Sequence, residues 1–358
     1  MGNIIDYVKE YGDRTFVERP FDEVDALVLS QFVYMKWEHV IPGLEAAAEP
    51  LSLVQMEGMI LSEDLMDKVF MDERYAKDNK ALFKAMVQSR RFGDMKCNYL
   101  VEDKNEEIVT QFFAITVFPV GALPVVVFRG TDESMLGWKE DFNMAYRSPV
   151  PGQTLASLYL KQVALRIDGD FVTAGHSKGG NLAAYSVMTA PKALQDRVVR
   201  IYDYDGPGFK NETKSRHGYE KIEDKIFKVV PESSIVGVIL EHAGGYKATD
   251  STAKGAMQHN PYTWVISDGA FAYLTDVRHS SGLFRDAITT WMSELGDDER
   301  ELVFGTIYNI LATTGAETTI ELKKDRMAPV NMLKAIIDLP EDTKERAKEI
   351  LHEFKIHV

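Results

Sequence analysis

An alternation of apolar strand-like runs and helix-like segments constrains the fold of this chain more than any other feature. The run Val125–Phe128 is apolar at every position, which is typical of a strand buried on both faces of a sheet. Helix-like and strand-like segments then alternate along the chain at 152–167, 171–174, 181–188, 198–204 and 226–230. This alternation predicts an α/β fold with a mostly parallel central sheet and helices on both of its faces.

The first third of the chain is predicted to begin with helices and to continue with two strands. Residues 1–92 have mainly helical patterns, and we expect them to cover one side of the sheet. Strand signals follow at 96–101 and 109–118, with a turn expected at 103–105 between them. The only cysteine, Cys97, falls in the first of these strands and is expected to be a small core residue.

The tail of the chain has a different character, because amphipathic helical patterns replace the strands. These patterns lie at 283–295, 302–311, 329–338 and 341–354. We therefore divide the chain into a core domain at 1–281, which includes the helical region 1–92, and a C-terminal helical extension at 282–358. The extension is expected to pack on the core, with a partner-binding surface or a dimer face as alternatives.

Charge and cysteine content argue against several classes of function. The 358 residues carry a formal net charge of −14, which disfavours binding to nucleic acid and simple electrostatic adsorption to anionic lipid. A single cysteine cannot form an internal disulfide or a cysteine-based zinc site. We expect no secretory signal, because the first residues have no cationic start followed by an apolar stretch, and no apolar run approaches the roughly 20 residues that span a bilayer. We therefore expect a cytoplasmic protein with no transmembrane segment, metal or cofactor; its oligomeric state stays open.

The segment Gly-His-Ser-Lys-Gly at 175–179 fits the pattern Gly-x-Ser-x-Gly, which is typical of a nucleophile elbow. In such an elbow the serine lies on a tight turn between a strand and a helix. Glycines are needed there because the turn leaves little room for side chains. An apolar strand at 171–174 precedes the segment and an Ala-rich helix follows it. This context predicts that Ser177 is a nucleophile, whereas the alternative is a glycine-rich turn in a non-catalytic sheet protein.

A second signal lies upstream, where Phe-Arg-Gly-Thr at 128–131 follows the buried strand and Trp-Lys-Glu-Asp at 138–141 comes after it. Together with the elbow, these segments resemble the class 3 lipase family of α/β-hydrolases over about residues 96–270. The longer segments Gly-His-Ser-Lys-Gly-Gly-Asn and Asp-Gly-Pro-Gly-Phe look nearest to a bacterial branch of these lipase-like proteins. The resemblance implies an α/β-hydrolase fold with N-terminal and C-terminal helical additions, and ester hydrolysis through a serine-bound acyl intermediate.

The resemblance also implies roles for the residues around the elbow. Thr131 would donate to the oxyanion, together with the backbone N–H of Lys178, the residue after the nucleophile. Arg129 and Asp141 are expected to form a structural ion pair rather than to take part in the chemistry. The side chain of Lys178 is expected to face solvent, and the alternative is recognition of an anionic substrate.

A serine nucleophile needs a base, and in this fold the base is a histidine that follows the serine in chain order. The candidates are His217, His242, His259 and His279. We expect His259 to be the base, because it lies in a turn just before an expected strand at 262–266 and matches the late position of the family's histidine. His242, which follows an apolar run, is second. His176 is the variable residue of the elbow and is expected to point away from the site.

The acid of the predicted triad departs from the family's pattern. That pattern places an aspartate in an Asp-Ile-Val-Pro context, but Ser234 stands at the corresponding position here. The alternatives are Asp205 at the end of the strand 198–204, Glu232 beside the expected position, or no acid at all. We select Asp205, whose competing role is that of a turn aspartate that accepts from backbone N–H groups before Gly-Pro.

The segment 132–150 is rich in apolar side chains and follows the predicted oxyanion residue. It is expected to be a lid that meets an acyl chain, and the alternative is packing against the N-terminal helices. If it is a lid, the substitution Met135→Asp would weaken activity on long-chain esters more than on acetate esters.

Three functions are compatible with these residues. The first is a serine ester hydrolase of lipase or esterase type that acts on a small-molecule or lipid ester. The second is a binding or regulatory protein that keeps the fold but has lost turnover, which the serine at 234 favours. The third is an acyltransferase, which the sequence does not separate from a hydrolase.

Overall fold

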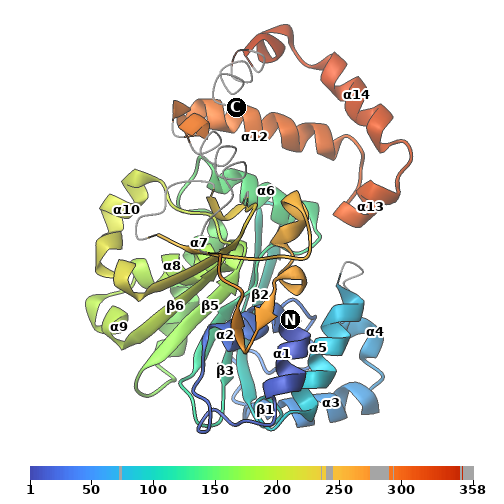
Figure 1. Cartoon of the computed structure of the whole chain (residues 1–358). Coiled ribbons are helices and arrows are strands. Elements are labelled where there is room, and N and C mark those ends of the chain that lie inside the picture. The colour runs from blue at the N-terminus through green and yellow to red at the C-terminus, as the bar shows by residue number, and fades with distance from the viewer. Residues whose placement is uncertain are drawn as a thin grey trace.

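An eight-stranded sheet runs through the centre of the computed structural model, with its strands side by side in chain order (Figure 1). The structure describes residues 1–71, 75–234, 236–238, 245–274, 290–292, 294–346 and 349. The strands are β1 (Leu51–Ser52), β2 (Lys96–Asn105), β3 (Thr110–Phe118), β4 (Val125–Phe128), β5 (Phe171–His176), β6 (Val198–Tyr204), β7 (Ile226–Pro231) and β8 (Lys247–Thr249). Pairs from β1 to β4 are antiparallel and pairs from β4 to β8 are parallel.

Strand β4 lies in the middle of the sheet and is buried on both faces. Val125 and Val127 belong to the apolar cluster on one face, whereas Val126 and Phe128 belong to the cluster on the other. Successive side chains of a strand point to opposite faces, so a strand covered on both sides must be apolar throughout. The prediction made from this run is confirmed.

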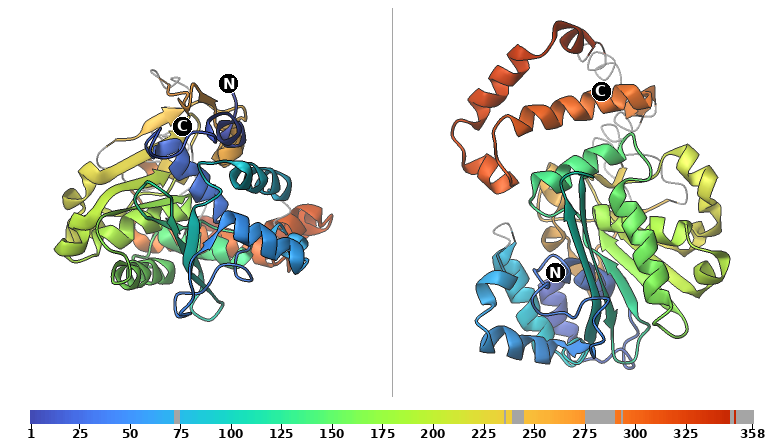
Figure 2. Two further views of the ribbon diagram at one scale, coloured as in Figure 1. Left: turned by 90° about the horizontal axis from the view of Figure 1, so that it is seen from below. Right: turned by 180° about the vertical axis from the view of Figure 1, so that it is seen from behind.

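The N-terminal region covers one face of the sheet, as predicted. Its helices are α1 (Ile4–Tyr11), α2 (Glu23–Phe32), α3 (Leu53–Ser62), α4 (Met66–Val69) and α5 (Ala76–Gln88). Side chains of Asn3 and Asp22 accept hydrogen bonds from the first backbone N–H groups of α1 and α2, which fixes where these two helices begin. Their apolar residues join those of β3, β4 and β5 in a single cluster. Figure 2 shows these helices gathered on one side of the sheet.

The opposite face carries the helices that connect the parallel strands (Figure 2). Helix α7 (Pro151–Ala164) leads into β5, and α8 (Lys178–Met188) and α9 (Lys192–Arg197) lead from β5 to β6. Helix α10 (Asn211–His217) lies between β6 and β7. A mostly parallel sheet with helices on both faces is the predicted α/β-hydrolase fold.

Two local predictions are wrong. The turn expected at 103–105 is shifted, because β2 continues to Asn105 and the chain reverses at 106–109. The strand expected at 262–266 is instead a short 3₁₀ helix, η5 (Pro261–Thr263), followed by the two-residue strand β9 (Ile266–Ser267). Pro261 suits the first position of a helix and the Asn260 side chain accepts from the Tyr262 N–H, so the local chain favours the helical turn.

The C-terminal helices of the structure agree in part with the helices predicted from the sequence. The structure has α12 (Asp297–Ala312), α13 (Thr319–Lys324) and α14 (Ala328–Asp338), and residues 341–346 are helical. Helix α12 packs on α6 (Met135–Met144), whereas α14 lies farther from the sheet (Figure 1). Most of the helix expected at 283–295 and the domain boundary after 281 lie outside the described residues, so the division into two domains stays a prediction.

Candidate active site

Ser177 lies on a strained turn between β5 and α8. Its backbone has φ 58° and ψ −133°, a conformation that non-glycine residues rarely adopt. A Cβ atom on Gly175 would lie 2.2 Å from the carbonyl carbon of Gly179, and one on Gly179 would lie 2.2 Å from the backbone oxygen of Phe128. Both glycines are therefore required by close backbone packing, which is the geometry expected of the elbow.

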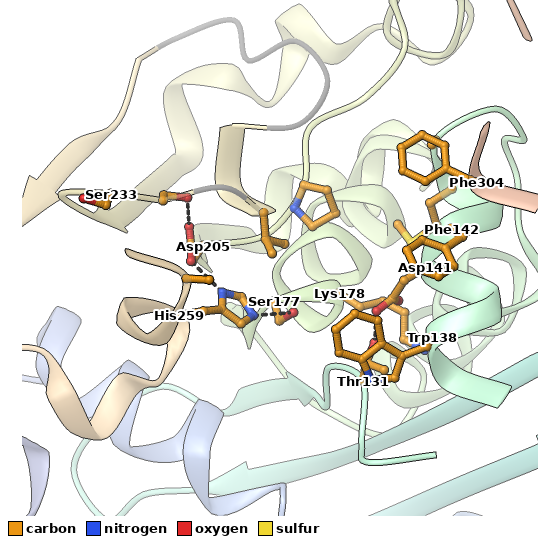
Figure 3. A pocket seen from close by; sticks show the side chains of 16 residues that line it. Thr131, Trp138, Asp141, Phe142, Ser177, Lys178, Asp205, Ser233, His259 and Phe304 are labelled. Atoms are coloured by element: carbon orange, nitrogen blue, oxygen red, sulfur yellow. Dashed lines mark hydrogen bonds and ion pairs between the residues drawn. The ribbon is translucent and has the colours of Figure 1, made fainter. Parts of the chain in front are cut away.

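A chain of hydrogen bonds runs from Ser177 to a buried carboxylate (Figure 3). The Oγ of Ser177 lies 2.9 Å from Nε2 of His259, and Nδ1 of His259 lies 2.6 Å from Oδ2 of Asp205. Because a carboxylate only accepts, Nδ1 carries the proton and Nε2 is left to accept from the serine hydroxyl. Asp205 is fully buried, whereas the His259 side chain is 30% exposed. The structure thus brings together the three residues predicted as nucleophile, base and acid.

Ser234 contacts the carboxylate of Asp205 rather than replacing it. The Ser234 hydroxyl and the Gly237 N–H both donate to Oδ1 of Asp205, the second at 3.1 Å. Of the two acids considered from the sequence, Asp205 is the one that contacts His259. The hydrogen bonds from Ser234 and Gly237 fix Oδ1 of Asp205, and this holds Oδ2 toward the imidazole of His259.

Of the other histidine candidates, His217 does not join this group of residues. His217 lies on α10, where its ring packs against Tyr185 with ring centroids 5.9 Å apart. His242 and His279 lie outside the described residues. His176 contacts the backbone of His259 and stays out of the pocket wall.

Thr131 and Lys178, the predicted oxyanion residues, both line the same pocket as Ser177. Lys178 is the first residue of α8, so the partial positive charge of the helix N-terminus faces this end of the pocket. The Thr131 hydroxyl donates to Oδ2 of Asp141, which positions the threonine. Burial raises the pKa of Asp141 to about 6, and its Oδ1 is shielded from solvent with no hydrogen-bond partner.

The expected ion pair between Arg129 and Asp141 is wrong. Arg129 donates to Glu102 at 2.9 Å, and its guanidinium lies 4.0 Å from the centroid of the Phe113 ring. Arg129 thus forms its ion pair with a residue of β2 and packs on a ring of β3. Asp141 belongs to α6 and faces the pocket with Thr131.

The prediction that the Lys178 side chain faces solvent is also wrong. Its ammonium is buried and donates to Oε2 of Glu140 at 2.8 Å, and to the backbone oxygen and Oε1 of Gln111 at 2.8 and 3.1 Å. Glu140 accepts in addition from the Gly152 N–H at 2.7 Å. This buried ion pair connects the elbow to β3, to α6 and to the start of α7. Recognition of an anionic substrate by this ammonium is therefore disfavoured.

An apolar pocket of about 370 Å³ opens beside Ser177 (Figure 3). Its apolar walls are formed by Trp138, Phe142, Met144, Ala145, Pro207, Val236, Ala256 and Phe304. The predicted lid segment 132–150 is largely the helix α6, which supplies Trp138 and Phe142. Met135 is buried outside this wall, so its substitution is a poor test of a lid.

Phe304 is a pocket residue that the sequence did not indicate. It belongs to α12 in the C-terminal region, and its ring stacks on Phe142 with centroids 5.7 Å apart and planes inclined by 28°. The amphipathic pattern at 302–311 predicted a buried face but could not show which element that face would meet. In the described part of the chain, no His, Cys, Asp or Glu cluster could hold a metal ion, and no helix is long and apolar enough to cross a membrane.

Comparison with known proteins places the chain in a family. The Mbeg1-like family model matches residues 86–309, so the chain belongs to the Mbeg1-like family, which is lipase-like. No curated protein matches the chain. Among solved structures, that of M37 lipase matches with 17% identity and a TM-score of 0.36, covering 62% of this chain and 70% of that one. The family match confirms the predicted resemblance to lipase-like proteins, whereas the nearer bacterial branch stays a prediction.

The buried ion pair between Lys178 and Glu140 leads to a stability prediction. Lys178→Met and Glu140→Gln should each lower the free energy of unfolding by about 3–5 kcal/mol, because each leaves a buried charge without its partner. The double variant should lose less than the sum of the two. Urea denaturation checks this, with Lys192→Met in an exposed ion pair as the control that should change little. Strictly additive losses would contradict the coupling.

Proposed function

We propose that this protein is a serine hydrolase that cleaves carboxylic esters through an acyl-enzyme on Ser177. The observation that carries the proposal is the chain of hydrogen bonds from Ser177 through His259 to the buried Asp205, at the mouth of an apolar pocket. Serine, histidine and carboxylate in this order are the constellation by which unrelated folds activate a serine hydroxyl. Membership of a lipase-like family supports the same class of reaction.

The proposed reaction follows from the positions of the three side chains. His259 accepts the hydroxyl proton through Nε2 while the oxygen of Ser177 bonds to the ester carbonyl carbon. The tetrahedral intermediate collapses, the bond to the alcohol breaks, and the imidazolium gives its proton to the leaving alkoxide. Water then attacks the acyl-enzyme by the same proton transfers and releases the acid. Asp205 keeps Nδ1 protonated and stabilises the transient imidazolium.

The oxyanion of each tetrahedral intermediate needs donors on the pocket side of Ser177. We assign these donors to the backbone N–H groups of Lys178 and Thr131, which line the pocket there, because the Thr131 hydroxyl already donates its one proton to Asp141. One such donor is worth about 3 kcal/mol in transition-state stabilisation. The Lys178–Glu140 ion pair and the Thr131–Asp141 hydrogen bond hold both groups before substrate arrives, so little reorganisation is needed during the reaction.

The pocket supports a substrate with an apolar acyl group. Its volume of about 370 Å³ lies near the lower end of the range of about 300–1,000 Å³ for small-molecule sites. Aromatic side chains of α6 and α12 would shield an acyl chain from water. Because a longer chain buries more apolar surface, the pocket would favour longer acyl chains over acetate. The serine at 234 favoured the alternative of an inactive binding protein, because it stands where the family has its acid. The contact of Asp205 with His259 supports the hydrolase instead. Product analysis with added alcohols would separate hydrolysis from acyl transfer.

Ester hydrolysis by variants of the three residues tests this function. We expect Ser177→Ala to abolish turnover of nitrophenyl butyrate, and Asp205→Asn to lower kcat by about 10⁴ because it disturbs the imidazole tautomer. Ser186→Ala, a buried serine elsewhere on α8, should keep wild-type kinetics. Turnover that survives in Ser177→Ala would refute the assignment.

The walls of the pocket lead to a chain-length prediction. Phe304→Glu should lower kcat/KM for octanoate esters by at least about tenfold, while kcat/KM for acetate esters should change little. Only the longer acyl chains reach this wall, and each methylene group buried against it is worth about 0.8 kcal/mol. Ile307→Glu, on the same helix but exposed, is the matched control. An equal loss on both esters would show that Phe304 does not form an acyl-binding wall.

A further inference from the structure

The N-terminal helical region supplies a side chain to the back of the elbow. Tyr34 follows α2 and is 5% exposed. Its hydroxyl lies 3.1 Å from Nδ1 of His176 and 3.3 Å from the backbone oxygen of the same residue. His176 is the variable residue of the elbow, directly before Ser177. The N-terminal region, which the sequence did not include in the predicted site, therefore contacts the residue next to the nucleophile.

The other nitrogen of His176 contacts the backbone of His259. Nε2 of His176 lies 2.9 Å from the carbonyl oxygen of His259. A carbonyl oxygen can only accept, so Nε2 carries a proton; in the neutral tautomer, Nδ1 and the His176 carbonyl share the single Tyr34 hydroxyl proton. The two imidazole rings also pack against each other, with centroids 4.7 Å apart and planes inclined by 36°. Both nitrogens of His176 are thus engaged, and the ring cannot serve as the base for Ser177.

The space for this contact depends on Gly130 of the Phe-Arg-Gly-Thr segment. A Cβ atom at Gly130 would lie 2.2 Å from the Tyr34 hydroxyl oxygen and 2.5 Å from the backbone oxygen of His176. Any side chain there would displace the tyrosine from the elbow. The glycine beside the predicted oxyanion residue therefore also makes room for the tyrosine.

Hydrogen bonds fix the segment that carries His259 at several points, and one of them comes from behind the elbow. His259 is the last residue of a 3₁₀ helix (η4, Gly255–His259), and Asn260 separates it from η5. Within this segment, the Trp264 indole donates to the carbonyl of Gln258 at 2.7 Å. The next carbonyl, that of His259 itself, is held by His176. His176 therefore contacts the backbone of the base residue itself, from behind the elbow.

We propose that Tyr34 and His176 are positioning residues that hold the backbone of His259 in register with Ser177. The proposal rests on the function proposed above. Tyr34 orients the imidazole of His176, and His176 fixes the His259 carbonyl so that Nε2 of His259 stays 2.9 Å from the serine oxygen. A displacement of about 1 Å between reacting groups can lower a rate by about 10². Neither residue lines the pocket beside Ser177.

Variants at 176 separate positioning from simple packing. In His176→Asn the amide reaches only about as far as Nδ1, whereas in His176→Gln it can reach the position of Nε2 and donate to the His259 carbonyl. We expect His176→Asn to lower kcat for nitrophenyl butyrate about 10²-fold with KM changed less than about twofold. His176→Gln should recover most of that loss, and Tyr34→Phe should lower kcat by about tenfold.

The labelling rate of Ser177 by a fluorophosphonate probe gives an independent readout and should fall in parallel with kcat. His217→Asn and Tyr159→Phe are matched controls, because one is a histidine outside the site and the other a buried, hydrogen-bonded tyrosine elsewhere. Both should label at the wild-type rate. Circular dichroism verifies folding, and Tyr34→Phe keeps the test decisive if a variant at 176 does not fold.

Two results would overturn the proposal while leaving the proposed function intact: wild-type labelling rates in both His176→Asn and Tyr34→Phe, or equal losses in His176→Asn and His176→Gln. A wild-type protein that is not labelled at all would instead refute the proposed function, and the positioning role would fall with it.

Discussion

Close backbone packing around Ser177 is the constraint on which the rest of the site depends. The positive φ of this serine occurs where α8 approaches β5 and the end of β4 so closely that only glycine fits at 175 and 179. Such strain persists only where the surrounding structure enforces it. Here it directs the hydroxyl toward His259 and places the N-terminus of α8 beside the pocket. The packing of the sheet and its two helical layers thus fixes the backbone conformation of Ser177.

Buried polar contacts then connect the elbow to the elements around it. The Lys178–Glu140 ion pair joins α8 to α6, and the Thr131–Asp141 hydrogen bond joins the end of β4 to the same helix. Helix α6 in turn carries the aromatic wall on which α12 packs. Burying charges is costly, so a site with this many buried ionisable groups favours a fixed geometry over maximal stability. That exchange is expected where catalytic groups must be held in place.

The sequence predicted the sheet and much of the site because both depend on local patterns. Apolar periodicity marked β4 to β7, and the order of strand ends brought Ser177, Asp205 and His259 to one edge of the sheet. The ion pair of Lys178, the partner of Arg129 and the contacts of Tyr34 and Phe304 were missed, because each joins residues far apart in the chain and leaves no periodic signal. The 3₁₀ turn at Pro261 shows the opposite case, in which a local signal was present and was overlooked.

Intact-protein mass spectrometry after reaction with a fluorophosphonate tests the central claim most directly. The account predicts one covalent adduct per chain, located on the peptide that contains Ser177, and no adduct in Ser177→Ala. An adduct on another residue, or a folded wild-type protein that gains no mass, would contradict it.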